Sequence, residues 1–319
     1  MQFEEAKGNL DIIKSSANAE ITNGNSNYSL QGAVYGLYQG GKEVGRATTD
    51  KNGKISFTNL KKGNYTLKEL TAPKGYALDI TTYNVTVESG KTVTKRVTDY
   101  PQSDPVTILL GKVDAETNAN KPQGTATLEG AEFTVKYYAT QSSTDPATSG
   151  HKAVRTWVLK TNEDGKTAFV DRLQVSGDEF YKDSTGANTL PLGTITIQET
   201  KAPKGYLLNS EVFVRQITSK GTAEGVQTYN MPTVPEIVQK GIIELQKVDS
   251  ETQKNDAQGA ASLEGAVYDI FLKSEYQAGD NTESASYRQT LTTDEEGKAK
   301  STELPLESFL FHLFQEQYL

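Results

Sequence analysis

The sequence contains no cysteine, and only two histidines and two methionines occur among its 319 residues. Without cysteine, no disulfide can brace the fold, so an extracellular protein of this composition needs another covalent support. Histidine occurs only at positions 151 and 312. A His-based metal site or a Ser-His-Asp triad therefore has almost no residues from which to be built. We expect no metal and no other cofactor.

Basic surface and long apolar segments are also lacking. The formal net charge is -8, which argues against nucleic acid or an anionic membrane as a partner, because both select basic surfaces. No run of 18 apolar residues is present, and residues 1–11 lack the basic start and the apolar stretch of a signal peptide. We expect no membrane insertion, and no export signal in the sequence as given.

Tyrosine, threonine and turn-forming dipeptides are plentiful instead. The 16 tyrosines and the many threonines favour strands, and Asn-Gly, Asp-Gly and Glu-Gly pairs punctuate the chain as hairpin turns do. No segment keeps a helical period of apolar residues over three turns. The composition therefore predicts an all-β protein rich in hairpins.

Internal repetition is the strongest signal in the sequence. A strand-like segment ending in lysine occurs three times, and sixteen residues after each lysine a leucine opens a second apolar segment. The three pairs are LDIIK with LQGAVYGLY, ILLGK with LEGAEFTVKYY, and IELQK with LEGAVYDIFL. Such recurrence predicts three copies of one plan. We name them the first, second and third repeats, with predicted boundaries at residues 1–104, 105–235 and 236–319.

Two kinds of loop connect the predicted strands. Acidic hairpin segments recur at 48–57, 160–169 and 292–301. Calcium binding is one interpretation of them, but the twelve-residue ligand series is missing, so we interpret them as turns. The second repeat has two further segments, 139–152 and 176–190, which we expect to be surface loops. Short, proline-bearing joints separate the repeats, which we therefore expect to lie end to end.

Each repeated lysine falls where strand alternation places the next core residue. Side chains two residues apart share one face of a strand, so Lys14, Lys112 and Lys247 are predicted to point inward. The apolar residues that share their faces are Leu10 and Ile12, Ile108 and Leu110, and Ile243 and Leu245. A solvated lysine at a strand end is the ordinary alternative, but the repeated register favours burial.

The same alternation predicts that two glutamates, and a residue at the end of each of two final strands, face inward. Glu69 and Glu199 each end an alternating stretch and precede an Ala-Pro-Lys-Gly-Tyr turn. The residue 30 positions after Glu69 is Asp99, and the residue 31 positions after Glu199 is Asn230. The alternative is that each glutamate lies at a sheet edge and pairs with the lysine of the turn, Lys74 or Lys204.

A buried lysine, glutamate and Asn or Asp would react with one another. Desolvation lowers the pKa of the lysine and raises the pKa of the glutamate, which gives a nucleophilic amine and a carboxylic acid that can donate a proton. Attack of the amine on Asn230 would release ammonia, and attack on Asp99 would release water. The product would be an amide bond between side chains, formed once and not turned over.

The order of these motifs resembles the Cna protein B-type (SpaA-like, isopeptide-forming) domains of Gram-positive surface adhesins and pilins. The resemblance covers nearly the whole chain. It implies tandem immunoglobulin-like, transthyretin-like β-sandwiches with crosslinks between lysine and Asn or Asp, promoted by a glutamate. Carried over to this sequence, the implied residues are Lys14, Glu69 and Asp99 in the first repeat and Lys112, Glu199 and Asn230 in the second.

Two departures from this family pattern stand out. Asp99 takes the place where most members have Asn. The third repeat keeps Lys247, but alignment with the second predicts a glutamate at position 313, where the sequence has Leu313, and no final strand follows. We therefore expect an incomplete third sandwich without a crosslink. The sorting signal that anchors such proteins to the cell wall, and the Tyr-Pro-Lys motif of pilin shafts, are also missing.

The resemblance implies a structural or adhesive segment of a cell-wall-associated extracellular protein, and no enzyme beyond the single self-crosslinking event. An alternative function is a module that binds host extracellular matrix or glycans through the loops of the second repeat. A third hypothesis treats the Lys, Glu and Asn residues as a site with turnover. Burial of these residues in a packed core argues against it.

Overall fold

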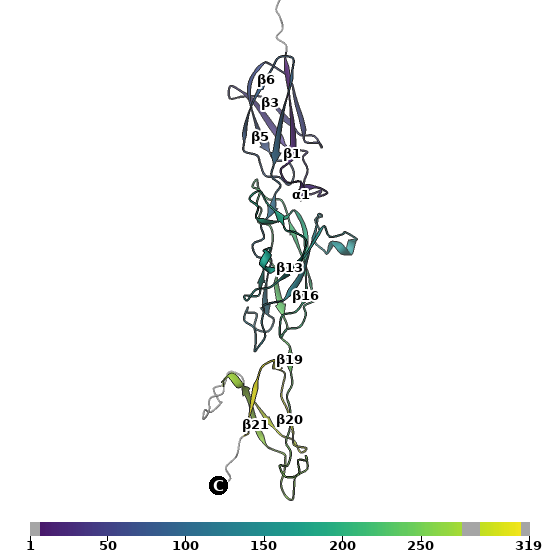
Figure 1. The fold of residues 1–319 in the computed structure, drawn as a ribbon, viewed down its shortest axis with the longest axis vertical. Coiled ribbons are helices and arrows are strands. Elements are labelled where there is room, and N and C mark those ends of the chain that lie inside the picture. Colours follow the sequence, from purple (N-terminus) through teal and green to yellow (C-terminus); the bar gives the residue numbers. More distant parts are fainter. Residues whose placement is uncertain (1–6, 276–287, 314–319) are drawn as a thin grey trace, which may run out of the picture. The chain divides into compact units, whose positions relative to one another are not determined.

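The computed structural model describes residues 7–275 and 288–313. It confirms the predicted all-β fold, and Figure 1 shows its strands in sequence colours. The chain divides into two compact units. Unit 1 comprises residues 1–111, 129–201 and 209–234, and unit 2 comprises residues 112–128, 202–208 and 235–319. Unit 1 therefore holds the first repeat and most of the second.

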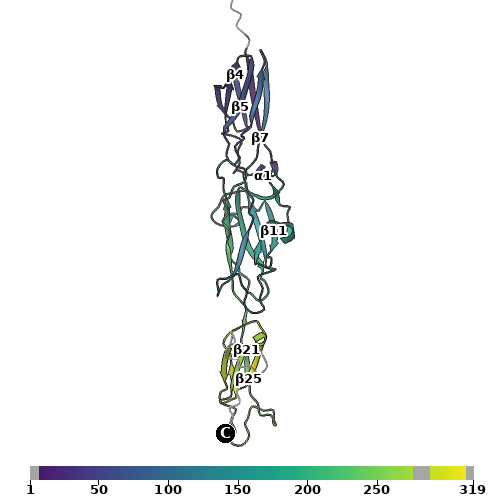
Figure 2. The same ribbon diagram turned by 90° about the vertical axis from the view of Figure 1, so that its left-hand side faces the viewer.

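The first repeat is a sandwich of two sheets. One sheet has the order β4-β1-β7, with β1 at Gly8–Ser16, β4 at Lys54–Leu60 and β7 at Thr92–Asp99. The other has the order β3-β2-β5-β6, with β2 at Val34–Gln39, β3 at Lys42–Thr48, β5 at Gly63–Thr71 and β6 at Thr82–Val87. Strand β1 pairs antiparallel with β4 and parallel with β7. The first and last strands of this sandwich are thus neighbours, and Figure 2 labels the last of them, β7, in the view at right angles.

Alternating apolar side chains fill the space between these sheets. Leu10 and Ile12 of β1 are fully buried and pack with Tyr35 and Leu37 of β2 and with Leu67 of β5. Every second residue of these strands faces inward because strand side chains alternate between faces. The same alternation carries charged side chains into the core where the apolar pattern ends.

The second repeat combines a five-stranded sheet with two smaller ones. The large sheet has the order β13-β11-β10-β16-β17, with β10 at Glu132–Tyr138, β11 at Arg155–Lys160, β13 at Gln174–Gly177, β16 at Gly193–Lys201 and β17 at Val212–Ile217. The sheet β12-β9-β18 consists of β9 at Leu110–Asp114, β12 at Lys166–Thr167 and β18 at Thr233–Glu236. A third sheet, β14-β15-β8, joins β8 at Ser103–Asp104, β14 at Tyr181–Lys182 and β15 at Asn188–Pro191.

Helices in the described residues are short, as the absence of a helical period predicts. They are α1 at Ala19–Thr22 and the 3-10 helices η1 at Pro146–Ser149, η2 at Asp171–Leu173 and η3 at Lys273–Glu275. Among the described residues, none of these helices is long or apolar enough to cross a membrane.

The acidic hairpin segments are turns, as predicted. The Asp50 carboxylate accepts hydrogen bonds from the N–H groups of Asn52 and Lys54, each at 2.8 Å. Gly53 adopts a φ of +71°, which favours glycine. Within the ranges described, no group of acidic or histidine side chains is arranged to hold a metal ion.

One long segment of the second repeat is more buried than the sequence predicts. Phe180 and Tyr181, within 176–190, are buried against Trp157, which is itself fully buried. Their apolar rings complete the core of the large sheet, so the prediction of a surface loop is wrong for this part. Ile108 was also expected to face inward but is 40% exposed, because β9 begins only at Leu110.

The first and second repeats share a buried joint within unit 1. The Tyr28 hydroxyl donates to the Gln102 carbonyl oxygen at 2.6 Å and accepts from the Leu192 N–H at 2.8 Å. The Asn25 amide donates to the Tyr137 hydroxyl at 2.8 Å. Tyr28 also belongs to the apolar cluster formed mainly by the second repeat. The loop after β1 is therefore part of the core that follows it.

The third repeat lies in unit 2 and has only two- and three-stranded sheets among the residues described. They are β19-β24, with β19 at Lys240–Gly241 and β24 at Leu304–Pro305; β20-β23, with β20 at Glu244–Gln246 and β23 at Lys298–Lys300; and β22-β21-β25, with β21 at Val267–Leu272, β22 at Arg288–Thr292 and β25 at Phe309–Leu313. Strand β20 pairs with β23 alone in this part of the chain, whereas β1 has a strand on both sides. The predicted incomplete sandwich is consistent with this topology.

The joint between the first two repeats predicts the effect of removing one hydroxyl group. Tyr28→Phe leaves the buried Leu192 N–H without its acceptor, so the free energy of unfolding should fall by about 1 to 3 kcal/mol. Chemical denaturation measures the loss. Tyr100→Phe is the matched control, because Tyr100 is 50% exposed and its substitution should change stability by less than about 0.5 kcal/mol. Equal effects of the two variants would contradict the role of the joint.

Candidate functional site

Lys14 lies inside the first sandwich, as strand parity predicts. It is the inward-facing residue that follows Leu10 and Ile12 on β1, and it is 2% exposed. Because an ammonium ion without a partner would cost several kcal/mol in such a place, the structure must supply opposite charge.

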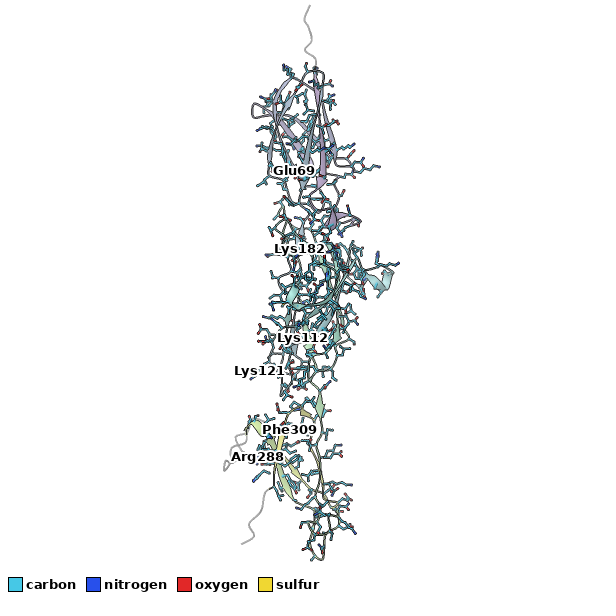
Figure 3. All side chains as sticks on the ribbon, viewed as in Figure 1. Glu69, Lys112, Lys121, Lys182, Arg288 and Phe309 are labelled. Carbon is cyan, nitrogen blue, oxygen red and sulfur yellow. The ribbon has the colours of Figure 1, made fainter. Side chains whose placement is uncertain are left out.

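Two carboxylates from different strands supply that charge. The Lys14 Nζ donates to Glu69 Oε1 at 2.7 Å and forms an ion pair with Asp99 Oδ1, and all three side chains are fully buried. The Tyr35 hydroxyl accepts a further hydrogen bond from Lys14 Nζ at 2.9 Å. Figure 3 labels Glu69 among the side chains of the first sandwich. The predicted set Lys14, Glu69 and Asp99 is thus brought together.

The strands fix these groups from both sheets. Lys14 and Asp99 belong to the parallel neighbours β1 and β7, whereas Glu69 stands opposite Tyr35 on the facing sheet. The second oxygen of Glu69 accepts from the Asp79 N–H at 2.8 Å, which holds the carboxylate in place. Lys74, the alternative partner of Glu69, instead donates to the Ser26 carbonyl oxygen at 2.9 Å.

Burial changes the acidity of Asp99. Desolvation raises the pKa of Asp99 from 3.8 to about 7, although the adjacent Lys14 ammonium acts in the opposite direction. Apart from the Lys14 ammonium, no hydroxyl or N–H group in the part of the chain that the structure describes donates a hydrogen bond to this carboxylate. Burial therefore favours the neutral acid form of Asp99 over the carboxylate.

The second repeat contains a comparable buried pair, but its acid differs from the predicted residue. Lys112, labelled in Figure 3, forms an ion pair with Glu236, and both side chains are fully buried in unit 2. Asn230, the predicted partner, is exposed in unit 1, and its backbone carbonyl oxygen accepts from the Arg215 side chain at 2.7 Å. Asn230 is therefore not buried as strand parity predicts.

The length of one connection explains this error. In the first repeat β6 ends at Val87 and β7 begins at Thr92, but in the second β17 ends at Ile217 and β18 begins only at Thr233. Part of the longer connection is used elsewhere, because the N–H groups of Thr228 and Tyr229 donate to Asp104 at 2.8 and 2.9 Å. A nearly constant spacing therefore pointed to Asn230, six residues before Glu236. The inward pair Val234 and Glu236 was the signal that could have located the true strand.

Glu199 occupies the strand position that Glu69 has in the first repeat. It is 3% exposed and stands opposite Phe133, as Glu69 stands opposite Tyr35. Its Oε2 accepts from the Asn209 N–H at 2.7 Å. The predicted burial of both glutamates is confirmed.

The third repeat lacks the corresponding acid. Strand β25 places Leu313 opposite Tyr268, which is the register position of Glu69 and Glu199 in the other repeats. Lys247 is only partly buried. The predicted replacement of the glutamate by Leu313 is confirmed by this register.

A family model and a known surface protein both match parts of this chain. The family model of the SpaA prealbumin-like fold domain matches residues 16–101 and 107–231, together more than half of the chain. A trypsin-resistant surface T6 protein of Streptococcus pyogenes is 45% identical over 58 residues, which are 18% of this chain and 11% of that protein.

One solved structure, with a TM-score above 0.5, shows the same type of fold. The TIE protein of Bacillus anthracis aligns with 98% of this chain and 46% of its own, with a TM-score of 0.61 and 23% identity. The major pilin subunit BcpA of Bacillus cereus aligns with 98% of this chain and 96% of its own, with a TM-score of 0.33 and 18% identity. The chain spans less than half the length of the T6 and TIE proteins.

The acidity of Asp99 predicts a pH-dependent stability once its lysine is removed. The Lys14→Met variant lacks the ammonium group that lowers the pKa of Asp99. The pKa of Asp99 in the folded variant therefore exceeds the 3.8 of the unfolded chain by at least as much as it does in the wild-type protein. The folded protein then holds a proton that the unfolded chain releases, and stability is lost as the pH rises. We expect a fall of about 1.4 kcal/mol per pH unit between about pH 5 and pH 7.

Urea denaturation at several pH values measures this slope. Lys14→Met/Asp99→Asn is the control, because it lacks the titrating carboxyl group and should lose the Asp99 share of the slope. A slope that is the same in both variants, or a stability that rises with pH in Lys14→Met alone, would contradict the assignment.

Proposed function

Because the chain belongs to the SpaA prealbumin-like domain family, we propose that it is a structural or adhesive segment of a Gram-positive cell-surface protein, stabilised by crosslinks between its own side chains. The observation that carries the proposal is the burial of Lys14 in contact with both Glu69 and Asp99. The proposal includes the division into three repeats and an extracellular, cell-wall-associated location.

The proposed reaction joins Lys14 to Asp99. A proton moves from the ammonium group to the carboxylates, the neutral Nζ attacks Cγ of the protonated Asp99, an amide C–N bond forms, and the C–OH bond breaks with release of water. Glu69 touches the reacting amine and can hold the proton in transit. We propose the same role for Glu199 in the second repeat from its equivalent register position.

Such a bond would stabilise the fold in a way suited to a stalk. It would close the loop from residue 14 to residue 99, which restricts the unfolded chain by about 4 kcal/mol in the chain-entropy model. It would also connect the first and last strands of the sandwich, so that a pull on the two ends of the repeat bypasses the strands between them. Unlike a disulfide, an amide resists reduction.

The same geometry argues against an enzyme with turnover. The side chains of Lys14, Glu69 and Asp99 have no exposed surface, so an external substrate cannot reach the amine without opening the sandwich. A single reaction within the chain needs no such access.

Mass spectrometry tests the crosslink in the first repeat. A peptide pair joined through Lys14 and Asp99 should be one water lighter than the sum of its sequences. Glu69→Gln should keep the full mass, because the amide cannot carry the proton. Glu88→Gln is the matched control, since Glu88 is a largely exposed partner of Lys91, and it should still crosslink. Free Lys14 in folded wild-type protein would refute the proposal, and Lys247 should be free in every variant.

A further inference from the structure

We propose that the Lys112 amine and the Glu236 carboxyl group condense to an isopeptide bond, so that the second repeat is crosslinked through a glutamate. This inference rests on the function proposed above. It assigns the acyl donor to a residue that neither the sequence spacing nor the family pattern of Asn or Asp singles out. Both residues, and the contacts used below for the second repeat, lie in unit 2.

Backbone contacts show that Glu236 holds the position that Asp99 holds in the first repeat. The Ala115 N–H donates to the Glu236 carbonyl oxygen at 2.8 Å, as the Ala17 N–H donates to the Asp99 carbonyl oxygen at 2.8 Å. In each repeat the donor lies three residues after the lysine. The lysine and the acid are therefore related by the same local geometry in both repeats.

The two Ala-Pro-Lys-Gly-Tyr turns confirm this equivalence. Tyr206 forms an isolated bridge with Val238, two residues after Glu236, and Tyr76 forms one with Pro101, two residues after Asp99. The flanking hydrogen bonds also match: Leu207 N to Ile237 O at 2.8 Å and Gln239 N to Gly205 O at 2.8 Å, compared with Ala77 N to Tyr100 O at 2.9 Å and Gln102 N to Gly75 O at 2.8 Å.

The side chains of this pair are set up for reaction. Lys112 and Glu236 form an ion pair with no exposed side-chain surface. Burial of two charges costs several kcal/mol that their mutual attraction only partly offsets. Transfer of one proton from the ammonium to the carboxylate removes both charges and leaves an amine beside a carboxylic acid, which are the reactants of amide formation.

A second acid near Lys112 does not compete. Asp114 lies two residues further on the same face of β9 and is fully buried. Its carboxylate accepts hydrogen bonds from Glu116 N, Thr117 N, Gln123 Nε2 and the Tyr206 hydroxyl at 2.9 to 3.0 Å. Burial opposes ionisation, but these donors together hold the pKa of Asp114 below its ordinary value. Asp114 thus stays ionised, and an ionised carboxylate is a poor acyl donor.

The proposed step balances without a further reactant. The neutral Nζ of Lys112 attacks Cδ of the protonated Glu236, and an amide C–N bond forms. The C–OH bond of the acid breaks, and the hydroxyl group leaves as water with a proton from the nitrogen. A bond to Asn230 would instead release ammonia, so the mass of the product identifies the acyl donor.

Peptide mapping of the full chain by mass spectrometry tests the inference. We expect a peptide pair joined through Lys112 and Glu236 whose mass is one water less than the sum of its two peptides. With the Lys14–Asp99 bond included, the intact mass of the chain should be two waters below the mass of its sequence. Glu236→Gln should keep the crosslink but lose ammonia at this site. Asn230→Ala, the matched control at the exposed position, should leave both bonds unchanged.

The other possible results contradict the Lys112–Glu236 bond. Free Lys112 together with an intact Lys14–Asp99 bond would refute this inference alone, and Lys112 joined to Asn230 would refute it in favour of the spacing-based assignment. Absence of both bonds would refute the proposed function too. Glu236→Ala should leave Lys112 free. If that variant fails to fold, the wild-type map and Glu236→Gln still decide.

Discussion

A lysine ammonium group buried between two carboxylates is the constraint on which the first sandwich depends. Lys14 comes from the first strand, Asp99 from the end of the last strand and Glu69 from the facing sheet. All three meet only if both sheets are packed in one register, because a slip of one residue would turn a charged group outward and leave its partner buried and unpaired. The polar cluster therefore specifies the register that the apolar core stabilises. A covalent bond would make that register permanent.

Buried polar groups are also hydrogen-bonded to one another where the first repeat joins the second. The loop that follows Lys14 enters the core of the second repeat, where Tyr28 satisfies a carbonyl oxygen on one side and an N–H group on the other. In unit 2 the loop that follows Lys112 is likewise ordered by buried contacts, with Asp114 bound by Thr117, Gln123 and Tyr206. Each lysine strand thus leads directly into a loop that stabilises the end of its repeat. In a chain without cysteine, these polar contacts take over part of the task that disulfides perform elsewhere.

Composition, strand parity and repetition were sufficient to predict an all-β fold, the buried Lys14, Lys112, Glu69 and Glu199, and the missing acid at position 313, whereas the sandwich arrangement was implied by the family resemblance. These features depend on local alternation, which a single sequence shows directly. The partner of Lys112 depends on the length of a connection, because residues 218–232 form a much longer connection than residues 88–91 of the first repeat. The segment VQTYNMP resembles the sequence at the end of the first repeat. This resemblance favoured Asn230 over Glu236, although the alternation of Val234 and Glu236 also indicates an inward-facing strand. The burial of Phe180 and Tyr181 was missed for a related reason, because tertiary packing against Trp157 overrides a polar local sequence.

The third repeat shows that a repeated lysine is not in itself a fully buried one. Lys247 keeps the sequence context of Lys14, yet the opposite strand offers Leu313 where a carboxylate stands in the other repeats. A strand such as β7, which brings Asp99 beside β1, has no counterpart next to β20 in the residues described. Without these two acids nothing compensates the desolvation of an ammonium group, and the side chain stays partly exposed. Burial of the lysine and supply of its acids are therefore one property of the fold, and the proposed crosslink depends on both together.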